Sequence, residues 1–406
     1  MFGTQLVTRS PNLPGWAAAL TDPAAFAHEQ AQLAQVWTFL GLATDIPNDG
    51  DWFRTSLGDR SVFVQRFEQE IRGFENLCVH RFYPLRTKEK GNGAIRCGFH
   101  HWQYNKEGRA VGIPHCQEFF GMTPRELGAR LTPIEIATCG MLIFGRFKPQ
   151  GATDTLEDYL DLGFPILQAL CSRSTPPYHT RHEVAANWKL SLHISLDDYH
   201  IVAVHGKTFG KRGYLDRTQL RYFRYGMHSA FINGTNDDGE LAKIVEACRK
   251  GRFPQPHYYR IFQFFPNFSI NVVRTIDRWY IILNHYRPLA IDRTLMRIWY
   301  FPAPFPMPNR NLLRNLLSSL NAYWLPYAVG HMNRKIAAED GGACEQMQKV
   351  AHRIEGSPIL GLEEERIAWF EENYAKVMAA PPLPPRQPAA AIVRNADRVA
   401  VITDQA

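Results

Sequence analysis

The sequence contains no apolar run of about 18 residues, the shortest that reads as a transmembrane helix. Its N-terminus also lacks the charged start and apolar core of a signal peptide. We therefore expect a cytoplasmic protein with no membrane partner. With 45% hydrophobic and 21% charged residues, the composition is that of an ordinary globular protein, and 406 residues allow two domains.

Cysteine is too scarce and too scattered for a disulfide framework. The chain has seven cysteines, of which two stand in short pairs with histidine. The remaining five are Cys116, Cys139, Cys171, Cys248 and Cys344. An odd, dispersed set of this kind favours reduced thiols in a cytoplasm.

A long basic block is also missing, although the formal net charge is +7. The lysine and arginine residues are dispersed, and no nucleic-acid-binding motif is recognisable. A basic surface can equally attract an acidic partner protein. We therefore expect no nucleic-acid partner.

Two short pairs of cysteine and histidine stand out against this background. Cys78 and His80 are separated from Cys97 and His100 by a gap of sixteen residues, which can hold a strand pair that brings two loops together. In a Rieske [2Fe–2S] centre, two thiolates hold one iron and two imidazoles hold the other. A structural zinc site accepts the same four ligands and stays open as an alternative.

The residues around these pairs resemble the large (α) subunit of the Rieske non-haem iron oxygenases. The resemblance is carried by the segments 76–85 and 97–104, in which Cys78, His80, Cys97 and His100 match the cluster ligands. Two positions depart from the family pattern, because Phe82 and His101 stand where the family usually has glycine. Neither departure removes a ligand, but both put the loop shape in question.

The elements expected from the sequence form an α+β chain with two domains. A helix should start at Thr21-Asp22-Pro23 and run to about Trp37, since aspartate caps a helix and proline suits its first turn. Short strands between turn residues then predict an all-β Rieske domain over residues 38–150. Its strands are expected at 39–42, 61–67, 71–74 and 141–147.

The rest of the chain should form a catalytic domain over residues 151–380, an antiparallel sheet with helices of the helix-grip or START-like kind, followed by a tail over 381–406. The segment 1–37 should pack on this domain. Strands are expected at 179–184, 259–265, 279–286 and 295–301. Helices are expected at 155–160, 239–248, in a leucine-rich stretch before Pro326, and at 362–378.

A second constellation follows an Asn-Trp-Lys sequence at residues 187–189. Asp197, His200 and His205 resemble the mononuclear iron motif of the same oxygenases, and Asp340 matches the third ligand, with Glu339 as the fallback. Two imidazoles and one carboxylate hold Fe(II) on one face and leave the positions open that oxygen chemistry needs. Taken singly, His200 or His205 could equally be a hydrogen-bonded structural histidine, and Asp340 a solvated charge on a helix.

Asp197 has a different implied role. By resemblance it bridges the two metal centres, linking an iron ligand to a cluster histidine of a neighbouring subunit, which implies a head-to-tail homotrimer. A carboxylate of this kind fixes an imidazole ring and raises its basicity. His193 lies where relatives often carry glutamate, and we expect it to be structural rather than a ligand.

The resemblance implies the terminal oxygenase component of a multicomponent Rieske system in aromatic hydrocarbon catabolism. It would use O₂ to mono- or cis-dihydroxylate an aromatic or small organic substrate, with oxidative N- or O-demethylation as the alternative. The sequence has no Gly-rich dinucleotide-binding fingerprint, so NAD(P)H would be oxidised by a separate flavin reductase, with or without a ferredoxin. A small β subunit is a possible further partner. Two alternative functions remain open, a Rieske electron carrier without oxygen chemistry and a zinc-stabilised binding module.

Overall fold

The structure is a computed structural model that divides into two compact units. It describes residues 16–173, 176–206, 208, 218–274, 279–303, 305 and 312–381, with the backbone alone for 312–326. Within these residues the larger unit comprises 16–44, Leu57–Asp59 and 137–381, and the smaller unit comprises Asp45–Ser56 and Arg60–Ile136. Most of the expected tail over 381–406 lies outside the described residues. The expected domain boundaries at 38, 150 and 380 stay predictions.

The larger unit is built on a seven-stranded antiparallel sheet in the order β11-β17-β16-β15-β14-β13-β12. Four of these strands confirm the expected ones and three were not expected. The expected strands are β11 (Tyr178–Val184), β14 (Arg260–Phe264), β16 (Trp279–Ala290) and β17 (Arg293–Pro302). The unexpected strands are β12 (Leu220–Tyr225), β13 (His228–Asn233) and β15 (Phe268–Arg274).

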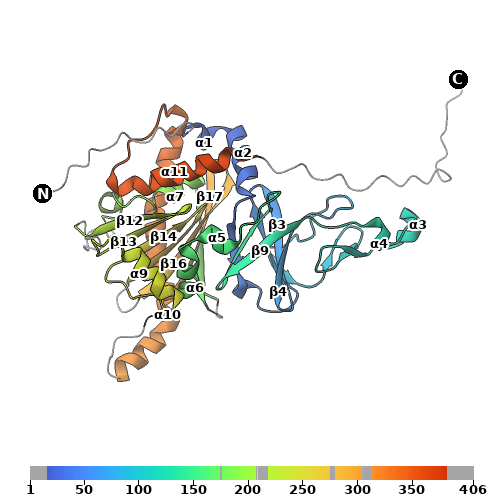
Figure 1. The fold of residues 1–406 in the computed structure, drawn as a ribbon, viewed down its shortest axis with the longest axis horizontal. Helices are drawn as coiled ribbons and strands as arrows, with labels where there is room; N and C mark the ends of the chain where they lie inside the picture. Colours follow the sequence, from blue (N-terminus) through green and yellow to red (C-terminus); the bar gives the residue numbers. More distant parts are fainter. Residues whose placement is uncertain are drawn as a thin grey trace. The chain divides into compact units, whose positions relative to one another are not determined.

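Both faces of this sheet are buried. Successive side chains of a strand point to opposite sides, so neighbouring residues of one strand belong to two different cores. On one face, Ile281 and Leu283 of β16 join a core with residues of the helices α5, α6 and α9. On the other face, Tyr280 and Ile282 join a core with residues of α7, α10 and α11 (Figure 1). The helices are α5 (Leu156–Leu160), α6 (Gly163–Cys171), α7 (Trp188–His193), α8 (Ile201–Val204), α9 (Glu240–Arg249), α10 (Leu312–Val350) and α11 (Glu365–Met378).

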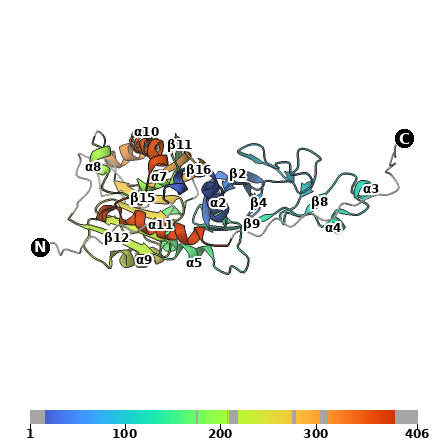
Figure 2. The same ribbon diagram turned by 90° about the horizontal axis from the view of Figure 1, so that it is seen from above.

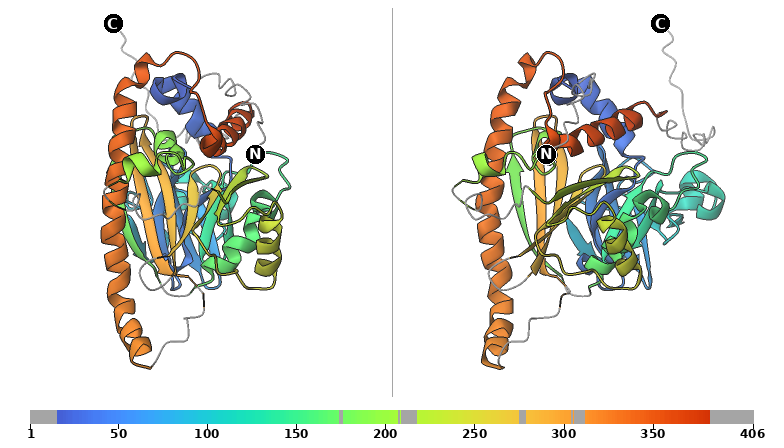
Figure 3. Two further views of the ribbon diagram at one scale, coloured as in Figure 1. Left: turned by 90° about the vertical axis from the view of Figure 1, so that its left-hand side faces the viewer. Right: turned by 60° about the vertical axis from the view of Figure 1, so that its left-hand side comes forward.

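The long helix α10 corrects one expectation. The leucine-rich helix does not end before Pro326 but continues to Val350. A proline inside a helix removes one backbone hydrogen bond and disturbs the preceding turn, which is a local cost that a long helix can absorb. Helix α10 runs alongside the sheet and contacts β11 and β17 (Figure 3). Among the described helices, none combines the length and the apolar run that crossing a bilayer requires.

Helix α2 (Pro23–Leu33) begins where the sequence indicated. The carboxylate of Asp22 accepts the N–H of Ala24 at 2.8 Å. The helix ends at Leu33, earlier than the expected Trp37, because β1 (Thr38–Leu42) follows closely. Helix α2 contacts α11, so helices from the two ends of the described chain lie together (Figure 2). The larger unit also contains α1 (Ala18–Thr21) and β10 (Leu142–Arg146), which pairs with β1.

The smaller unit is dominated by β structure. Its strands are β2 (Asp51–Leu57), β3 (Arg60–Phe67), β4 (Glu70–Glu75), β5 (Lys90–Asn92), β6 (Ile95–Arg96), β7 (Gln103–Tyr104), β8 (Ala110–Gly112) and the start of β9 (Pro133–Cys139), with short helices α3 (Cys116–Phe120) and α4 (Pro124–Leu127). The gap between the two cysteine–histidine loops holds two strands, β5 and β6, but they do not pair with each other. β5 pairs with β2, and β6 pairs with β7, so each loop is anchored in a different sheet.

Candidate metal centres

The two cysteine–histidine loops of the smaller unit share one backbone pattern. In each loop, the cysteine N–H donates to the carbonyl five residues later, and its carbonyl accepts the N–H four residues later. The donor–acceptor distances lie between 2.8 and 3.1 Å for Cys78 with Phe82 and Tyr83, and for Cys97 with His101 and Trp102. These bonds close two matching turns, so each turn presents one sulfur and one imidazole.

The two departures from the family pattern lie at the same place in these turns. Phe82 has φ of 57° and His101 has φ of 60°, both in the left-handed region that glycine adopts without a steric cost. A larger L-residue there is strained, and the backbone nevertheless keeps the turn. The loop shape that Phe82 and His101 put in question is therefore retained.

The four residues expected to hold the cluster all lie in the smaller unit. Cys78 and Cys97 are each 1% exposed. The ring centroids of His80 and His100 are 4.6 Å apart, and Nδ1 of His80 is buried without a hydrogen-bond partner among the described residues. Burial raises the pKa of the Cys78 thiol. Two buried sulfurs, an adjacent imidazole pair and an unsatisfied ring nitrogen fit a Rieske [2Fe–2S] cluster.

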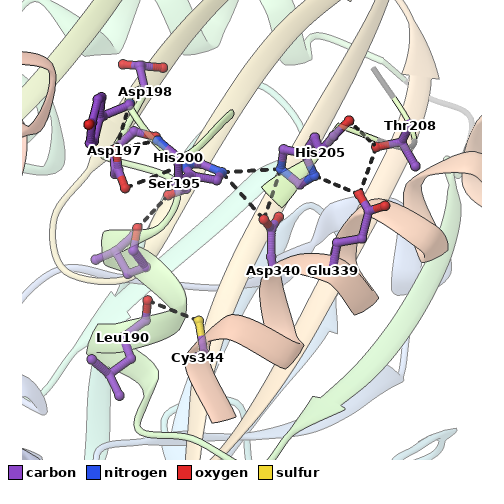
Figure 4. A network of polar contacts seen from close by, with 12 residues as sticks. Leu190, Ser195, Asp197, Asp198, His200, His205, Thr208, Glu339, Asp340 and Cys344 are labelled. Carbon is purple, nitrogen blue, oxygen red and sulfur yellow. Dashed lines mark hydrogen bonds and ion pairs between the residues drawn. The ribbon is translucent and has the colours of Figure 1, made fainter. Parts of the chain in front are cut away.

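The second set of expected ligands converges in the larger unit. His200 and His205 flank α8, and Asp340 comes from α10 (Figure 4). Oδ1 of Asp340 lies 3.0 Å from Nε2 of His205 and 3.5 Å from Nε2 of His200, and the two Nε2 atoms are 3.2 Å apart. Among the described residues, these three side chains form a group able to hold a metal ion. Two imidazoles and one carboxylate are the ligand set of non-haem ferrous iron.

The electrostatics of this group favour a positive charge between the three side chains. Burial lowers the pKa of His200, but the adjacent carboxylates of Asp197 and Asp340 outweigh it and raise the pKa to about 10. The pKa of His205 is also raised, since Asp340 and Glu339 outweigh its burial. A bound cation would meet the same carboxylates and displace those protons, so the donor set fits a divalent metal.

Glu339 does not take the place of the third ligand. Its Oε2 lies 2.8 Å from Nδ1 of His205 and accepts the hydroxyl of Thr208 at 2.8 Å (Figure 4). Glu339 thus faces the outer side of a ring whose inner nitrogen faces Asp340. The sequence shows Glu339 and Asp340 side by side but does not indicate which one faces the metal position. That choice follows from the orientation of α10 relative to His205.

Asp197 stabilises the backbone turn that leads into His200. Its Oδ1 accepts the N–H groups of Tyr199 at 2.7 Å and His200 at 3.1 Å. Nδ1 of His200 lies 2.7 Å from the carbonyl oxygen of Asp197 and 3.5 Å from its Oδ2. Asp197 therefore fixes the ring of His200 within its own chain. Its expected link to a neighbouring subunit stays a prediction.

The next residue, Asp198, was not singled out in the sequence. It is 1% exposed, and its Oδ2 lies 2.8 Å from Nη2 of the fully buried Arg366 on α11. Arg366 also donates to the carbonyl of Ser195 at 3.3 Å. This pair ties the segment before His200 to α11. No local signal in the sequence could join residues so far apart.

The Asn-Trp-Lys sequence before the iron motif is structural. The side chain of Asn187 caps α7 by accepting the N–H of Lys189 at 3.0 Å. Glu29 on α2 accepts the indole N–H of Trp188 and the hydroxyl of Tyr374 on α11, each at 2.6 Å, and pairs with Lys189. Lys189 and Glu29 are both essentially inaccessible to solvent. The motif therefore joins α7 to both terminal helices.

His193 belongs to the same packing and lies outside the metal group found among the described residues. Its Nε2 lies 3.0 Å from Oε1 of Glu371, and its ring stacks on Trp16 with centroids 5.0 Å apart. This position agrees with the structural role expected from the sequence.

A cavity of about 620 Å³ lies beside the His200–His205–Asp340 group. All three side chains line it, together with residues of β14, β15, β16 and β17 and one side of α10. Most of the wall is apolar, with Ile282, Ile298 and Met296 from the sheet. A mostly apolar cavity with a few polar groups is the usual form of a small-molecule site.

Comparison with known protein families shows to which family the chain belongs. Residues 172–380, more than half of the chain, match the catalytic domain of the ring hydroxylating alpha subunit. The chain belongs to the ring-hydroxylating alpha-subunit family. Residues 36–131 match the Rieske [2Fe-2S] domain. The cluster and the non-haem iron expected from the sequence are the cofactors of this family, and the His/His/Asp site is present.

Curated relatives of this chain are named dioxygenases and monooxygenases. The large subunit of anthranilate 1,2-dioxygenase from Burkholderia cepacia is 29% identical over 226 residues, which are 53% of this chain and 50% of the relative. The large oxygenase component of salicylate 5-hydroxylase from Ralstonia sp is 27% identical over 58% of this chain and 59% of the relative. The chain spans about half the length of the curated relatives it matches.

Solved structures share the fold of this chain. Naphthalene 1,2-dioxygenase from Rhodococcus sp. superposes with a TM-score of 0.68 at 22% identity, covering 89% of this chain and 94% of that one. A quaternary ammonium Rieske monooxygenase superposes with a TM-score of 0.66 at 17% identity, with the same coverage. The α+β fold, a Rieske domain plus a catalytic domain, is thereby confirmed.

Proposed function

We propose that the chain is the terminal oxygenase component of a Rieske system that hydroxylates an aromatic or small organic substrate. The observation that carries this proposal is the convergence of His200, His205 and Asp340 on the wall of the 620 Å³ cavity. A ligand triad that closes only one side of a metal ion, beside a cavity of ligand size, suits chemistry between a substrate and O₂. An electron carrier needs neither feature.

The side chains around the triad have separate tasks in this proposal. His200, His205 and Asp340 hold ferrous iron, which supplies the centre for oxygen activation. Asp197 and Glu339 each face an outer ring nitrogen and fix the two imidazoles in their orientations. The apolar wall with Ile282 and Ile298 binds the substrate body and excludes water from the reacting positions.

The partners follow from the same proposal. Electrons come from NAD(P)H through a separate flavin reductase, with or without a ferredoxin, and enter at the Rieske cluster held by Cys78, His80, Cys97 and His100. The chain assembles as a homotrimer in which Asp197 connects the two kinds of metal centre across subunits. The Rieske and alpha-subunit domains support the two metal centres. A solved quaternary ammonium Rieske monooxygenase of the same fold, for which inter-subunit electron transfer is described, supports the assembly.

Metal analysis with electron paramagnetic resonance tests the proposal. We expect about three irons per chain and a Rieske signal after reduction with dithionite. His200→Ala should lower the iron content to about two per chain, keep the Rieske signal and abolish substrate-dependent O₂ consumption with a donor reductase. The exposed His352→Ala is the matched control and should behave as the parent. Zinc in place of iron, or turnover in His200→Ala, would refute the proposal.

A further inference from the structure

A single peptide group connects the iron site to the start of helix α11. Its carbonyl, which belongs to Asp197, accepts the Nδ1–H of His200 at 2.7 Å (Figure 4). Its N–H, which belongs to Asp198, donates to the carbonyl of Glu363, just before α11, at 3.1 Å. A trans peptide group is planar, so its carbonyl and its N–H point in opposite directions and turn together. The orientation of the His200 ring therefore depends on what holds Asp198.

The side chain of Asp198 is held from the same part of the chain. Its Oδ2 accepts a hydrogen bond from Nη2 of Arg366 at 2.8 Å, and the same Nη2 donates to the carbonyl of Ser195 at 3.3 Å. The hydroxyl of Tyr259 donates to Oδ1 of Asp198 at 3.3 Å. Both the backbone and the carboxylate of Asp198 are thus fixed by residues at the start of α11.

The guanidinium of Arg366 makes few contacts for a buried charge. The residue is fully buried, and its Nε and Nη1 have no hydrogen-bond partner among the described residues. Its Cζ lies 5.8 Å from the ring centroid of Tyr222 and 5.5 Å from that of Phe231. Apolar residues in place of a buried ion pair are often as stable or more stable, so stability alone does not account for this pair. A rigid guanidinium does fix the direction of the groups that it binds.

We propose that Arg366 is a positioning residue of the iron site, which acts through Asp198 on the orientation of His200. This inference rests on the proposed function, because it assigns the ion pair to the geometry of the ferrous site. With Arg366 in place, the carbonyl of Asp197 stays directed at Nδ1 of His200, and Nε2 faces the metal position beside Asp340. Without the pair, the peptide group between Asp197 and Asp198 is free to turn, and the ring loses its fixed direction.

A double variant separates positioning from folding. Arg366→Met alone leaves the carboxylate of Asp198 buried without its cation, which destabilises the larger unit. Asp198→Ala combined with Arg366→Met removes both charges and should recover much of that stability. The matched control is Glu240→Ala combined with Arg260→Met, which deletes an ion pair of 2.9 Å between α9 and β14, outside the cavity lining. Calorimetry gives the unfolding midpoint of each variant.

The iron site should respond to the Asp198/Arg366 double variant although the fold is recovered. The half-time of mononuclear iron loss to a chelator should fall about tenfold, as expected when the support behind a metal-bound histidine is removed. The electron paramagnetic resonance spectrum of the ferrous site with nitric oxide as the probe should broaden, because His200 no longer has one orientation. The Rieske signal should stay unchanged. The control pair should keep the half-time and the spectrum of the parent.

Two results would overturn the positioning role. One is an Asp198/Arg366 double variant with the iron retention and the nitric oxide spectrum of the parent. The other is a control pair that loses iron equally fast at the same unfolding midpoint, since iron loss would then follow stability alone. Where the double variant does not fold, Arg366→Lys keeps the charge without the planar guanidinium, and a half-time equal to that of the parent would refute the role.

The iron content of the parent separates this inference from the proposed function. A parent with only about two irons per chain would contradict the proposed function itself. A parent with about three irons, whose double variant keeps them as firmly, would contradict the positioning role alone.

Discussion

Oε2 of Glu339 lies 2.8 Å from Nδ1 of His205, so a carboxylate faces the side of the ring that points away from the metal group. The adjacent residue Asp340 faces the inner nitrogen of the same ring at 3.0 Å. Successive residues of α10 therefore take two roles, one toward the metal position and one behind its ligand. Thr208 adds a second hydrogen bond to Glu339 and holds that carboxylate in place.

Glu339→Gln should weaken retention of the mononuclear iron about 10- to 100-fold, the usual effect of losing a carboxylate behind a metal-bound histidine. The amide keeps the shape of the side chain but loses the charge that favours the Nδ1–H tautomer of His205. The half-time of iron loss to a chelator measures the effect. The Rieske signal should stay unchanged, and Glu355→Gln at an exposed position is the control. Iron retention equal to that of the parent would show that Glu339 only packs.

The buried pair of Lys189 and Glu29 predicts a large effect on stability. Lys189→Met leaves the carboxylate of Glu29 buried and uncompensated, which costs about 3–5 kcal/mol. Glu29→Gln combined with Lys189→Met removes both charges; the new amide oxygen can still accept the indole N–H of Trp188, and the amide NH₂ can donate to the hydroxyl oxygen of Tyr374. Calorimetry of the larger unit's unfolding transition should therefore give the lowest midpoint for the single variant. A double variant no more stable than Lys189→Met would contradict this account.

The left-handed residues of the cluster loops predict gains in stability. Phe82→Gly and His101→Gly should each stabilise the smaller unit by about 1 kcal/mol, because glycine adopts positive φ without the steric cost. Both side chains are exposed, so little packing is lost. Arg81→Gly, next to Phe82 and without a positive φ, should destabilise instead. The thermal midpoint at which the cluster absorbance is lost measures all three.

His228 makes stability depend on pH. It is fully buried; Nδ1 accepts the N–H of Phe265 at 3.0 Å and Nε2 donates to the carbonyl of Tyr159 at 2.8 Å, which fixes the neutral ring. Burial lowers its pKa from 6.5 to about 4. Between these values the unfolded chain binds more protons, so stability is complete above pH 6.5 and falls as the pH drops toward 4. The full loss amounts to about 3 kcal/mol.

His228→Asn removes this titration. The midpoint of thermal unfolding, measured in steps from pH 7.5 to about 4.5, should fall less steeply for the variant than for the parent. His352→Asn, at an exposed position, should leave the slope unchanged. Equal slopes for His228→Asn and the parent would mean that other groups, such as the buried His285, govern the acid limb.

The sequence predicted several strongly patterned strands and missed others, including β15 with its Val272 and Val273. β16 and β17 are rich in aromatic and β-branched residues, and both were expected. β12 and β13 carry arginine, histidine and asparagine, and their strand character depends on pairing with neighbours, which local composition does not report. Pro326 predicted a helix end that the structure does not have, because the fold of a long helix can override one residue's preference.

Ligand identity was easier to predict than the surroundings of the ligands. Cys78 and His80, like His200 and His205, are close in the sequence, so a short sequence motif includes both residues of each pair. Asp340 required the resemblance, since nothing local connects it to His205 across 134 intervening chain positions. Pairings such as Asp198 with Arg366 exist only in the folded chain.

The Glu29–Lys189–Tyr374 contacts also set an order of events during synthesis. Tyr374 leaves the ribosome after nearly all of the described chain, so the buried ammonium of Lys189 has its complete set of partners only when translation is almost finished. The smaller unit, whose described residues end at Ile136, has no such dependence. Domains generally fold in the order in which they emerge. Nascent chains stalled before residue 374 should therefore hold a folded cluster-binding unit attached to an iron-binding unit that is still open to proteases.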